Sequence, residues 1–257
     1  MLTLTTAQIT AWIGDLFWPF VRVAMVFSVA PMFSGRLVPV RIRLVLALLI
    51  TWLLLPVIPP APAVEPFSAA GILIIVQQLL IGLLLGFTLQ MVFGAMVVGG
   101  QMLAMSMGLG FASMVDPQNG VQSTVVGQYY VSLAALLFFA LNGHLALISV
   151  LADSFHTLPL DGSGVGRGGL WAVLGFAGRM FAGGVLVALP AVAALLLANI
   201  TFGVITRAAP QLNIFGVGFP LIMTLGFVVM MFSLPVFLPQ FSGLMTDALA
   251  LLAALGG

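Results

Sequence analysis

Two long stretches of this chain contain no charged residue, and they limit the kind of fold that the chain can adopt. Fifty residues without a charge separate Glu65 from Asp116, and thirty-nine separate Arg207 from Asp247. Charged residues make up 5% of the 257 residues and hydrophobic residues 62%, whereas soluble domains carry about 25% and about 45–50%. Because the chain has too few polar side chains to cover a soluble surface, the sequence predicts an integral membrane protein.

The composition also excludes several classes of function. A formal net charge of +1 leaves no basic surface for nucleic acid, and the absence of cysteine removes thiolate sites and disulfides. Two histidines are present, and Asn142, Gly143 and His144 are interpreted as a polar cluster near a helix end. No HExxH pair, paired carboxylates or activated serine is found. The sequence therefore predicts no enzyme, no metal site and no cofactor.

Six apolar segments can be placed along the chain, and their unbroken length favours helices over a transmembrane barrel. The prediction is an all-α, polytopic helical membrane protein that forms a single integral domain over residues 1–257. The first segment contains Asp15 and lacks the features of a signal peptide, so it is interpreted as a retained helix. The six segments are Ile9–Phe33, Leu44–Ile58, Ala69–Val98, Thr124–Leu151, Leu170–Ile205 and Ile214–Phe237.

Arginines in the first loop set the predicted orientation. Arg36, Arg41 and Arg43 lie close together, and positive residues accumulate on the cytoplasmic side of a membrane. We therefore expect the first loop, the turn at Asp116 and the loop at Arg207 in the cytoplasm. Both chain termini are then expected outside.

The lengths of the segments do not match a simple bundle. At 1.5 Å per residue, Ala69–Val98 would span about 45 Å and Leu170–Ile205 about 54 Å, against a hydrocarbon layer of about 30 Å. Leu44–Ile58 would reach only about 22 Å. Either the long segments break into hairpins, at Gly183–Gly184 or Pro190 in the fifth, or they leave the bilayer and bury their surface in other proteins.

A Met- and Gly-rich stretch, Gln101–Met114, separates the third and fourth segments. Six of the fourteen methionines fall between Met91 and Met114. Flexible methionines fill irregular gaps and re-pack, which suits either ordinary helix packing or a deformable apolar seal. The glycines give the tip mobility, so the candidate plug residues are Met107, Gly108, Gly110, Phe111 and Met114. Small residues at Gly100, Ala104, Gly108 and Ala112 also predict a helix-packing face.

Three ionisable residues lie within apolar segments and are costly there. Asp15 and Arg22 share one helix face but lie about 10 Å apart along the axis, which is too far to pair. Each is expected to contact another segment or the headgroup region. Arg179 is likewise interpreted as paired or reaching toward the membrane surface.

Two stretches of sequence resemble a known family. The break between the last two apolar segments contains Arg207, Pro210, Gln211, Asn213, Gly218 and Pro220. The stretch from Gly108 to Ser123 contains a turn at Asp116, Pro117 and Gly120. The first stretch resembles the signature, and the second the central loop, of the FliR family, the inner-membrane subunit of the flagellar type III secretion export gate.

The resemblance implies a fold and a set of partners. Residues 1–165 are expected to pack like a FliP subunit, with a plug loop at about residues 106–122, and residues 166–257 to form a FliQ-like helical hairpin. One copy would assemble with several copies of FliP and FliQ into a conical channel, beside FlhB, in the flagellar basal body. Phe111 and Met114 would contact a methionine ring of FliP. The channel would pass unfolded flagellar proteins across the bacterial inner membrane.

Three other functions stay open at this point. A virulence-type secretion homologue would share the fold and the role. A secondary transporter would show inverted repeats and polar sites at the midplane, and only the Gly and Pro interruptions suggest one. A scaffold without a pore role would tolerate changes in the plug.

Overall fold

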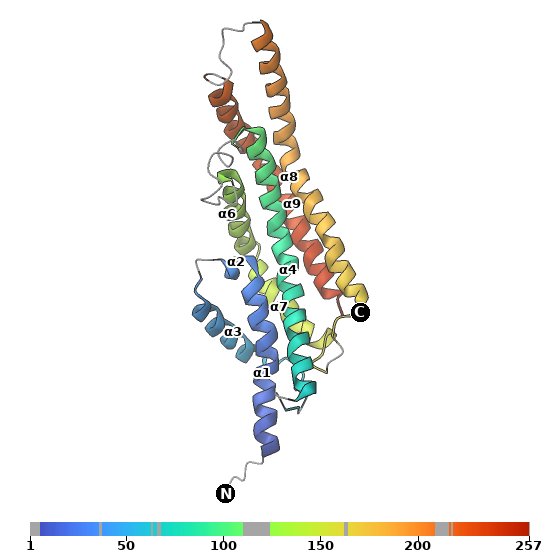
Figure 1. The fold of residues 1–257 in the computed structure, drawn as a ribbon. Coiled ribbons are helices and arrows are strands. Elements are labelled where there is room, and N and C mark those ends of the chain that lie inside the picture. Colours follow the sequence, from blue (N-terminus) through green and yellow to red (C-terminus); the bar gives the residue numbers. More distant parts are fainter. Residues whose placement is uncertain are drawn as a thin grey trace. The chain divides into compact units, whose positions relative to one another are not determined.

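The computed structural model describes residues 6–35, 38–62, 64–65, 68–109, 124–161, 164–208, 216 and 218–256 (Figure 1). These residues form helices and no strand, which confirms the all-α prediction. The helices are α1 (Thr6–Val29), α2 (Pro31–Ser34), α3 (Val40–Leu54), α4 (Ala69–Ser106), α6 (Val125–Ala140), α7 (Gly143–Thr157), α8 (Arg167–Ala208) and α9 (Phe219–Ala253).

Fewer helices can cross a membrane than the six apolar segments suggest. Within the described residues, α4, α8 and α9 are long and apolar enough, and α6 with α7 would make a fourth span if this bent pair counts as one. The predicted fourth apolar segment contains two helices, because it breaks between Ala140 and Gly143. Asn142 sits at the break with φ 57°, a left-handed conformation that asparagine tolerates. The interpretation of Asn142–His144 as a helix end is confirmed.

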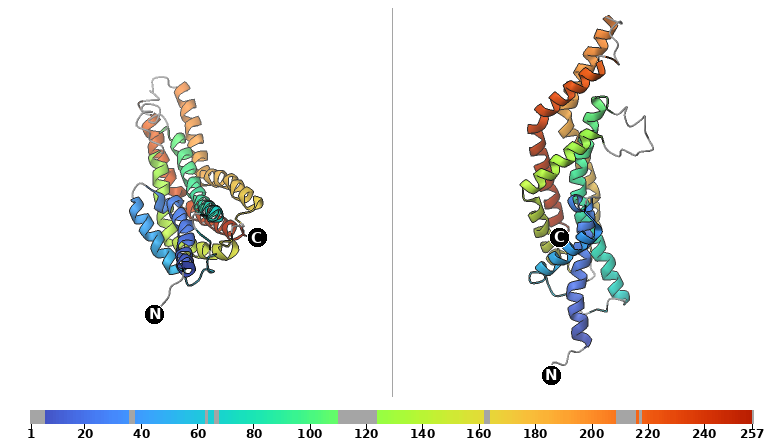
Figure 2. Two further views of the ribbon diagram at one scale, coloured as in Figure 1. Left: turned by 60° about the horizontal axis from the view of Figure 1, so that its bottom comes forward. Right: turned by 90° about the vertical axis from the view of Figure 1, so that its left-hand side faces the viewer.

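The fifth apolar segment forms one helix rather than a hairpin. Helix α8 runs for 42 residues and includes Gly183, Gly184 and Pro190. Figure 2 draws its ribbon without a break. Proline is tolerated in apolar helices where neighbouring groups replace its lost hydrogen bond. The hairpin alternative is thus wrong for this segment. At 1.5 Å per residue, α8 is about 63 Å long, roughly twice the hydrocarbon thickness.

The chain divides into two compact units, each built from separate stretches of sequence. The first unit comprises Met1–Met91, Asn142–Ala177 and Thr246–Gly257, and the second comprises Val92–Leu141 and Gly178–Met245. The division predicted at residue 165 between FliP-like and FliQ-like parts stays a prediction.

Aromatic rings fill the core of the second unit. Phe93 of α4 packs edge-on against Phe138 of α6 and Phe241 of α9, with ring centroids 5.9 and 5.8 Å apart. Tyr130 of α6 meets Phe237 of α9 at 5.1 Å. Such edge-to-face pairs add to the stability that area burial alone provides. The cluster therefore holds α4, α6 and α9 together.

Glycines bring the backbone of α4 close to α6 and α8 in this unit. A Cβ added to Gly100 would lie 2.6 Å from the Cα of Gly127 in α6. A Cβ added to Gly184 of α8 would lie 2.8 Å from the carbonyl oxygen of Ala95 in α4. Ala104 is fully buried. The predicted small-residue packing face is confirmed at Gly100 and Ala104. It is wrong at Gly108, which lies beyond the last residue of α4 with φ +80°, and Ala112 lies outside the described residues.

We expect Gly184→Ala to destabilise the second unit by about 1–3 kcal/mol, because the new methyl group meets backbone that cannot move aside. Gly178, on the same helix, has open space around its Cβ position. Gly178→Ala is therefore the matched control, and it should be neutral or stabilising by about 0.5–1 kcal/mol through helix propensity. Thermal unfolding midpoints of the two purified variants would test this. Equal midpoints would refute the backbone contact.

Candidate functional site

Helix α4 ends in a Schellman motif at the start of the predicted plug. Gly108 adopts φ +80°, its N–H donates to the carbonyl of Met105, and the N–H of Leu109 donates to the carbonyl of Ala104. This pair of hydrogen bonds around a left-handed glycine is the standard way to satisfy the last carbonyls of a helix. Gly108 therefore has a definite structural role, because it stops α4 at a fixed residue.

Side chains of α8 and α9 contact the same helix end. The Nδ2 of Asn199 in α8 donates to the carbonyl oxygen of Ser106, at 3.3 Å. Met107 is fully buried, and a Cβ added to Gly226 of α9 would lie 2.5 Å from its Cγ. The ring of Phe219 in α9 lies 3.1 Å from the Cβ position of Gly108. The last turn of α4 is thus held from two sides.

Helix α6 begins against the same part of α4. Thr124 is its N-cap, and the hydroxyl oxygen of Thr124 accepts from the N–H of Gly127, at 3.1 Å. The backbone N–H of Thr124 donates to Oε1 of Gln101 in α4, at 3.4 Å. A threonine N-cap satisfies one of the free N–H groups at a helix start. Leu109 therefore completes the cap of α4, and Thr124, at the start of α6, contacts α4 again.

Only two of the predicted plug residues lie within the described chain. Met107 is buried beside α9 and Gly108 forms the helix stop, as set out above. Their part in a plug stays a prediction. The other plug and turn residues lie outside the described residues: Gly110, Phe111, Met114, Asp116, Pro117 and Gly120.

The family motif that begins at Arg207 separates two apolar helices, α8 and α9. Arg207 lies in the last turn of α8, where a positive charge interacts favourably with the helix dipole. Gly218 is buried directly before α9, and Pro220 is the second residue of α9, in the first turn where proline is tolerated. Pro210, Gln211 and Asn213 lie outside the described residues.

Arg22 forms a buried polar cluster in the first unit. The side chain is fully buried, and its Nε donates to Oε1 of Gln78 in α4, at 2.7 Å. Its Nη1 donates to the carbonyl and the hydroxyl of Ser154, and Nη2 to the carbonyl of Leu158, at the end of α7. The guanidinium carbon also lies 4.2 Å from the ring centroid of Phe155. The expected contact of Arg22 with other segments is confirmed.

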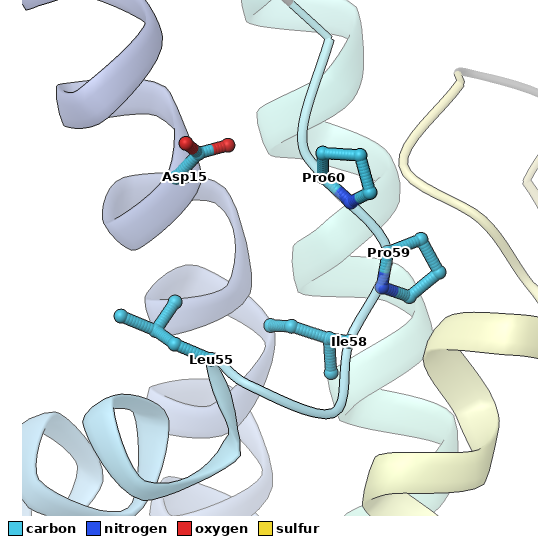
Figure 3. Close-up of a pocket in the computed structure, with 5 residues that line it drawn as sticks. All are labelled: Asp15, Leu55, Ile58, Pro59 and Pro60. Atoms are coloured by element: carbon cyan, nitrogen blue, oxygen red, sulfur yellow. The ribbon is translucent and has the colours of Figure 1, made fainter.

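Asp15 also contacts another segment. Its Oδ1 accepts from the backbone N–H of Ala61, at 3.0 Å, in the connection that follows α3. Figure 3 shows this carboxylate beside a small pocket of about 280 Å³, lined by Asp15, Leu55, Ile58, Pro59 and Pro60. One carboxylate among apolar side chains offers no pair for acid–base work. In the part of the chain that the structure describes, no group of three or more His, Cys, Asp or Glu residues could hold a metal ion.

Comparison with known proteins bears on two of the functions left open. The family described as bacterial export proteins, family 1, matches residues 13–248. The flagellar biosynthetic protein FliR of Escherichia coli K12 is 40% identical over 98% of this chain and 97% of its own length. The chain belongs to the FliR family. The FliR of Pectobacterium carotovorum is 38% identical over 98% of this chain and 97% of its own, and that of Bacillus subtilis 28% over 82% of each.

Membership of the FliR family makes the chain a membrane protein of flagellar protein export, as the sequence predicts. The three relatives are named as flagellar proteins, which favours the flagellar system over the virulence-type alternative. An export family also weighs against a secondary transporter. The match extends over almost the entire chain, so it includes both α4 and the α8–α9 connection.

Sequence reasoning missed several residues that hold the end of α4. Asn199 and Gly226 contact this end, and Gln101 within α4 accepts the N–H of Thr124. None of the three is among the predicted site residues. A usable signal existed for Asn199, because a lone amide in a long apolar stretch requires a hydrogen-bonding partner. For Gln101 and Gly226 the contact depends on packing, which the local sequence does not encode.

Proposed function

We propose that this FliR-family chain is a channel-forming subunit of the flagellar type III export gate in the bacterial inner membrane. It is a structural subunit without catalysis, and it assembles with FliP and FliQ, as one copy, beside FlhB. The assembled gate passes unfolded flagellar proteins outward. The energy for export comes from other components, since the sequence has neither a phosphate-binding loop nor paired intramembrane acids.

The exposed apolar surface of α8 is the observation that carries this proposal. Trp171 near one end of the helix is 73% exposed, and Val204 near the other end is 63% exposed. Their positions differ by thirty-three residues, which is about 50 Å along a helix. A hydrocarbon layer of about 30 Å cannot cover both ends. Partner subunits with apolar surfaces would cover what the lipid leaves exposed.

Helix α9 presents a similar surface. Met231 and Phe232 are 68% and 76% exposed, in a helix that is long enough to cross the membrane. Large contiguous apolar patches on proteins mark interaction sites or membrane contact. Helices α8 and α9 lie within residues 166–257, which are expected to form a FliQ-like hairpin. FliQ and FlhB are therefore the proposed partners on this surface.

The proposed plug begins at the end of α4. Residues 107–114 would close the passage at rest, with Phe111 and Met114 against methionines of FliP. An apolar constriction excludes ions by dewetting, and methionine side chains can re-pack around an extended polypeptide. The same seal can therefore block ions and part for an unfolded substrate.

Co-expression with FliP and FliQ tests the assembly. We expect the tagged chain to be purified as a discrete complex that contains both partners, and the complex to restore swimming in a flagellated strain that lacks FliR. A stable monomer that does not bind FliP or FliQ would contradict the proposal and favour a transporter. Assembly without recovery of swimming would favour the virulence-type homologue.

A further inference from the structure

Helix α3 packs on α1 and leaves most of its own apolar surface exposed. Figure 1 shows α3 alongside α1. The buried residues of α3 are Ala47, Thr51 and Leu54, which follow one another at the spacing of a single helix face. Most of the other apolar side chains of α3 are exposed, and Trp52 is 70% exposed. The packing on α1 therefore leaves a large apolar surface of this helix uncovered.

Five exposed residues form what we call the outer face of α3. The spacing i, i+4, i+7, i+8 and i+11 places them on one side of the helix. The first and the last of them are eleven residues apart, which is about three turns and about 16 Å along the axis. The outer face therefore has a cation near one end, an indole near the other and aliphatic side chains between them. Its members are Arg41, Val45, Leu48, Leu49 and Trp52.

The length of α3 and the positions of these two residues favour a helix that lies along the membrane surface. Helix α3 has 15 residues, or about 22 Å, and it is not among the described helices that can cross a membrane. If α3 stood upright with Arg41 at the headgroups, Trp52 would lie about 16 Å deeper, near the centre of the hydrocarbon layer. Arginine and tryptophan both prefer the level of the headgroups. Both reach that level when the helix lies flat.

The charge of this part of the chain matches an acidic lipid surface. Every charged residue between Asp15 and Glu65 is an arginine, and Arg41 and Arg43 lie in the first turn of α3. The helix dipole disfavours positive charge in a first turn, so these arginines do not stabilise α3 itself. Acidic headgroups attract arginines close to the membrane surface. The sequence also predicts the first loop in the cytoplasm, and the cytoplasmic leaflet carries a negative surface potential.

We propose that α3 is an interfacial helix that binds the acidic phospholipid surface of the membrane. Arg41 contacts lipid phosphates, and Trp52 lies at the same depth. The aliphatic residues of the outer face enter the upper part of the acyl region, as in other amphipathic helices at membrane surfaces. The inference goes beyond the proposed function, and it holds whether or not the chain forms a channel.

Depth measurements test the orientation of α3. The chain contains no cysteine, so single spin labels can be attached to Ile42→Cys and Leu53→Cys while Arg41 and Trp52 are kept. Both positions are exposed, and they share one side of the helix about 16 Å apart along its axis. In the full-length chain in nanodiscs of phosphatidylcholine and phosphatidylglycerol, we expect equal depths within about one helical turn, or about 5 Å. A larger difference would show an upright helix and refute the proposal.

The same labels distinguish lipid from a protein partner on this surface. When the labelled chain is purified with FliP and FliQ and placed in the same nanodiscs, both labels should stay accessible to oxygen, which concentrates in the acyl region. Loss of this access in the complex would mean that a partner subunit covers α3, and the proposal would be overturned.

Substitutions at Arg41 test the class of lipid. Binding of phosphatidylglycerol to the full-length chain in detergent can be measured by native mass spectrometry. Arg41→Gln should weaken it about fivefold, the factor that one arginine near a membrane surface provides. Arg41→Lys keeps the charge and should retain most of the affinity. Arg167→Gln is the matched control, because it removes an exposed arginine outside α3. Equal affinities of Arg41→Gln and Arg167→Gln, or equal binding of phosphatidylcholine by the parent chain, would overturn the proposal.

Discussion

Deletion of residues 107–114 should open the resting gate to ions. The deletion removes the proposed apolar seal, and each 1.4 kcal/mol taken from a barrier raises the rate of passage about tenfold. Because excluding an ion from a dry constriction costs at least that much, we expect conductance to rise about tenfold or more. Conductance of the purified complex in lipid bilayers, together with the collapse of membrane potential in cells, measures the effect.

A second variant keeps the chain length and the helix cap. The deletion also removes Gly108, which ends α4 with φ +80°, so a change in packing could contribute to the leak. Phe111→Ala combined with Met114→Ala leaves this cap in place and should still conduct. Met105→Ala is the matched control, because Met105 is 65% exposed and precedes the seal. If the variant that lacks residues 107–114 assembles in normal amounts and does not conduct ions, these residues do not form the plug.

The membrane class could be predicted from the composition, and the helical fold from the unbroken length of the apolar segments. In lipid, a long apolar segment can satisfy all its backbone hydrogen bonds within itself as a helix. The break in the fourth segment was predicted as a polar helix end at Asn142, but its effect on the number of spans was not. The continuity of α8 was not predictable, because Gly184 marks the close approach to α4 rather than a turn. A glycine needed for packing and a glycine needed for a turn look identical in a sequence.

Part of the candidate site could likewise be predicted from the sequence, and part depends on packing. The glycine-rich tip indicated a mobile segment, whereas the structure gives Gly108 a fixed role as the left-handed residue of a helix cap. A glycine directly after an apolar periodic stretch is a helix-stop signal, so this role was open to prediction. The contact between Asn199 and Ser106 joins residues 93 positions apart, and only the packing of α8 on α4 determines it.

Arg22→Met should lower the free energy of unfolding more than Gly184→Ala does. The guanidinium bridges α1, α4 and the end of α7, and its removal leaves the buried acceptors of Gln78 and Leu158 without this donor. Hydrogen bonds to a charged group contribute about 1.5–3 kcal/mol each. Part of their loss is offset, because the variant no longer buries a charge. The expected net loss in the free energy of unfolding is about 3 kcal/mol or more. The amount of chain in membranes and the unfolding midpoint of the purified complex measure it.

Replacing a buried charge by an apolar group is harmless only when its partners are replaced too. The double variant Arg22→Met, Gln78→Leu removes one stranded acceptor, and it should recover about 1–2 kcal/mol relative to Arg22→Met alone. Arg22→Lys cannot reproduce the fork that reaches three partners, so it should recover little. Arg43→Ala is the matched control, since Arg43 is half-buried and donates to the single carbonyl of Val38. Full stability of Arg22→Met would show that the cation is dispensable and that α7 is held by packing alone.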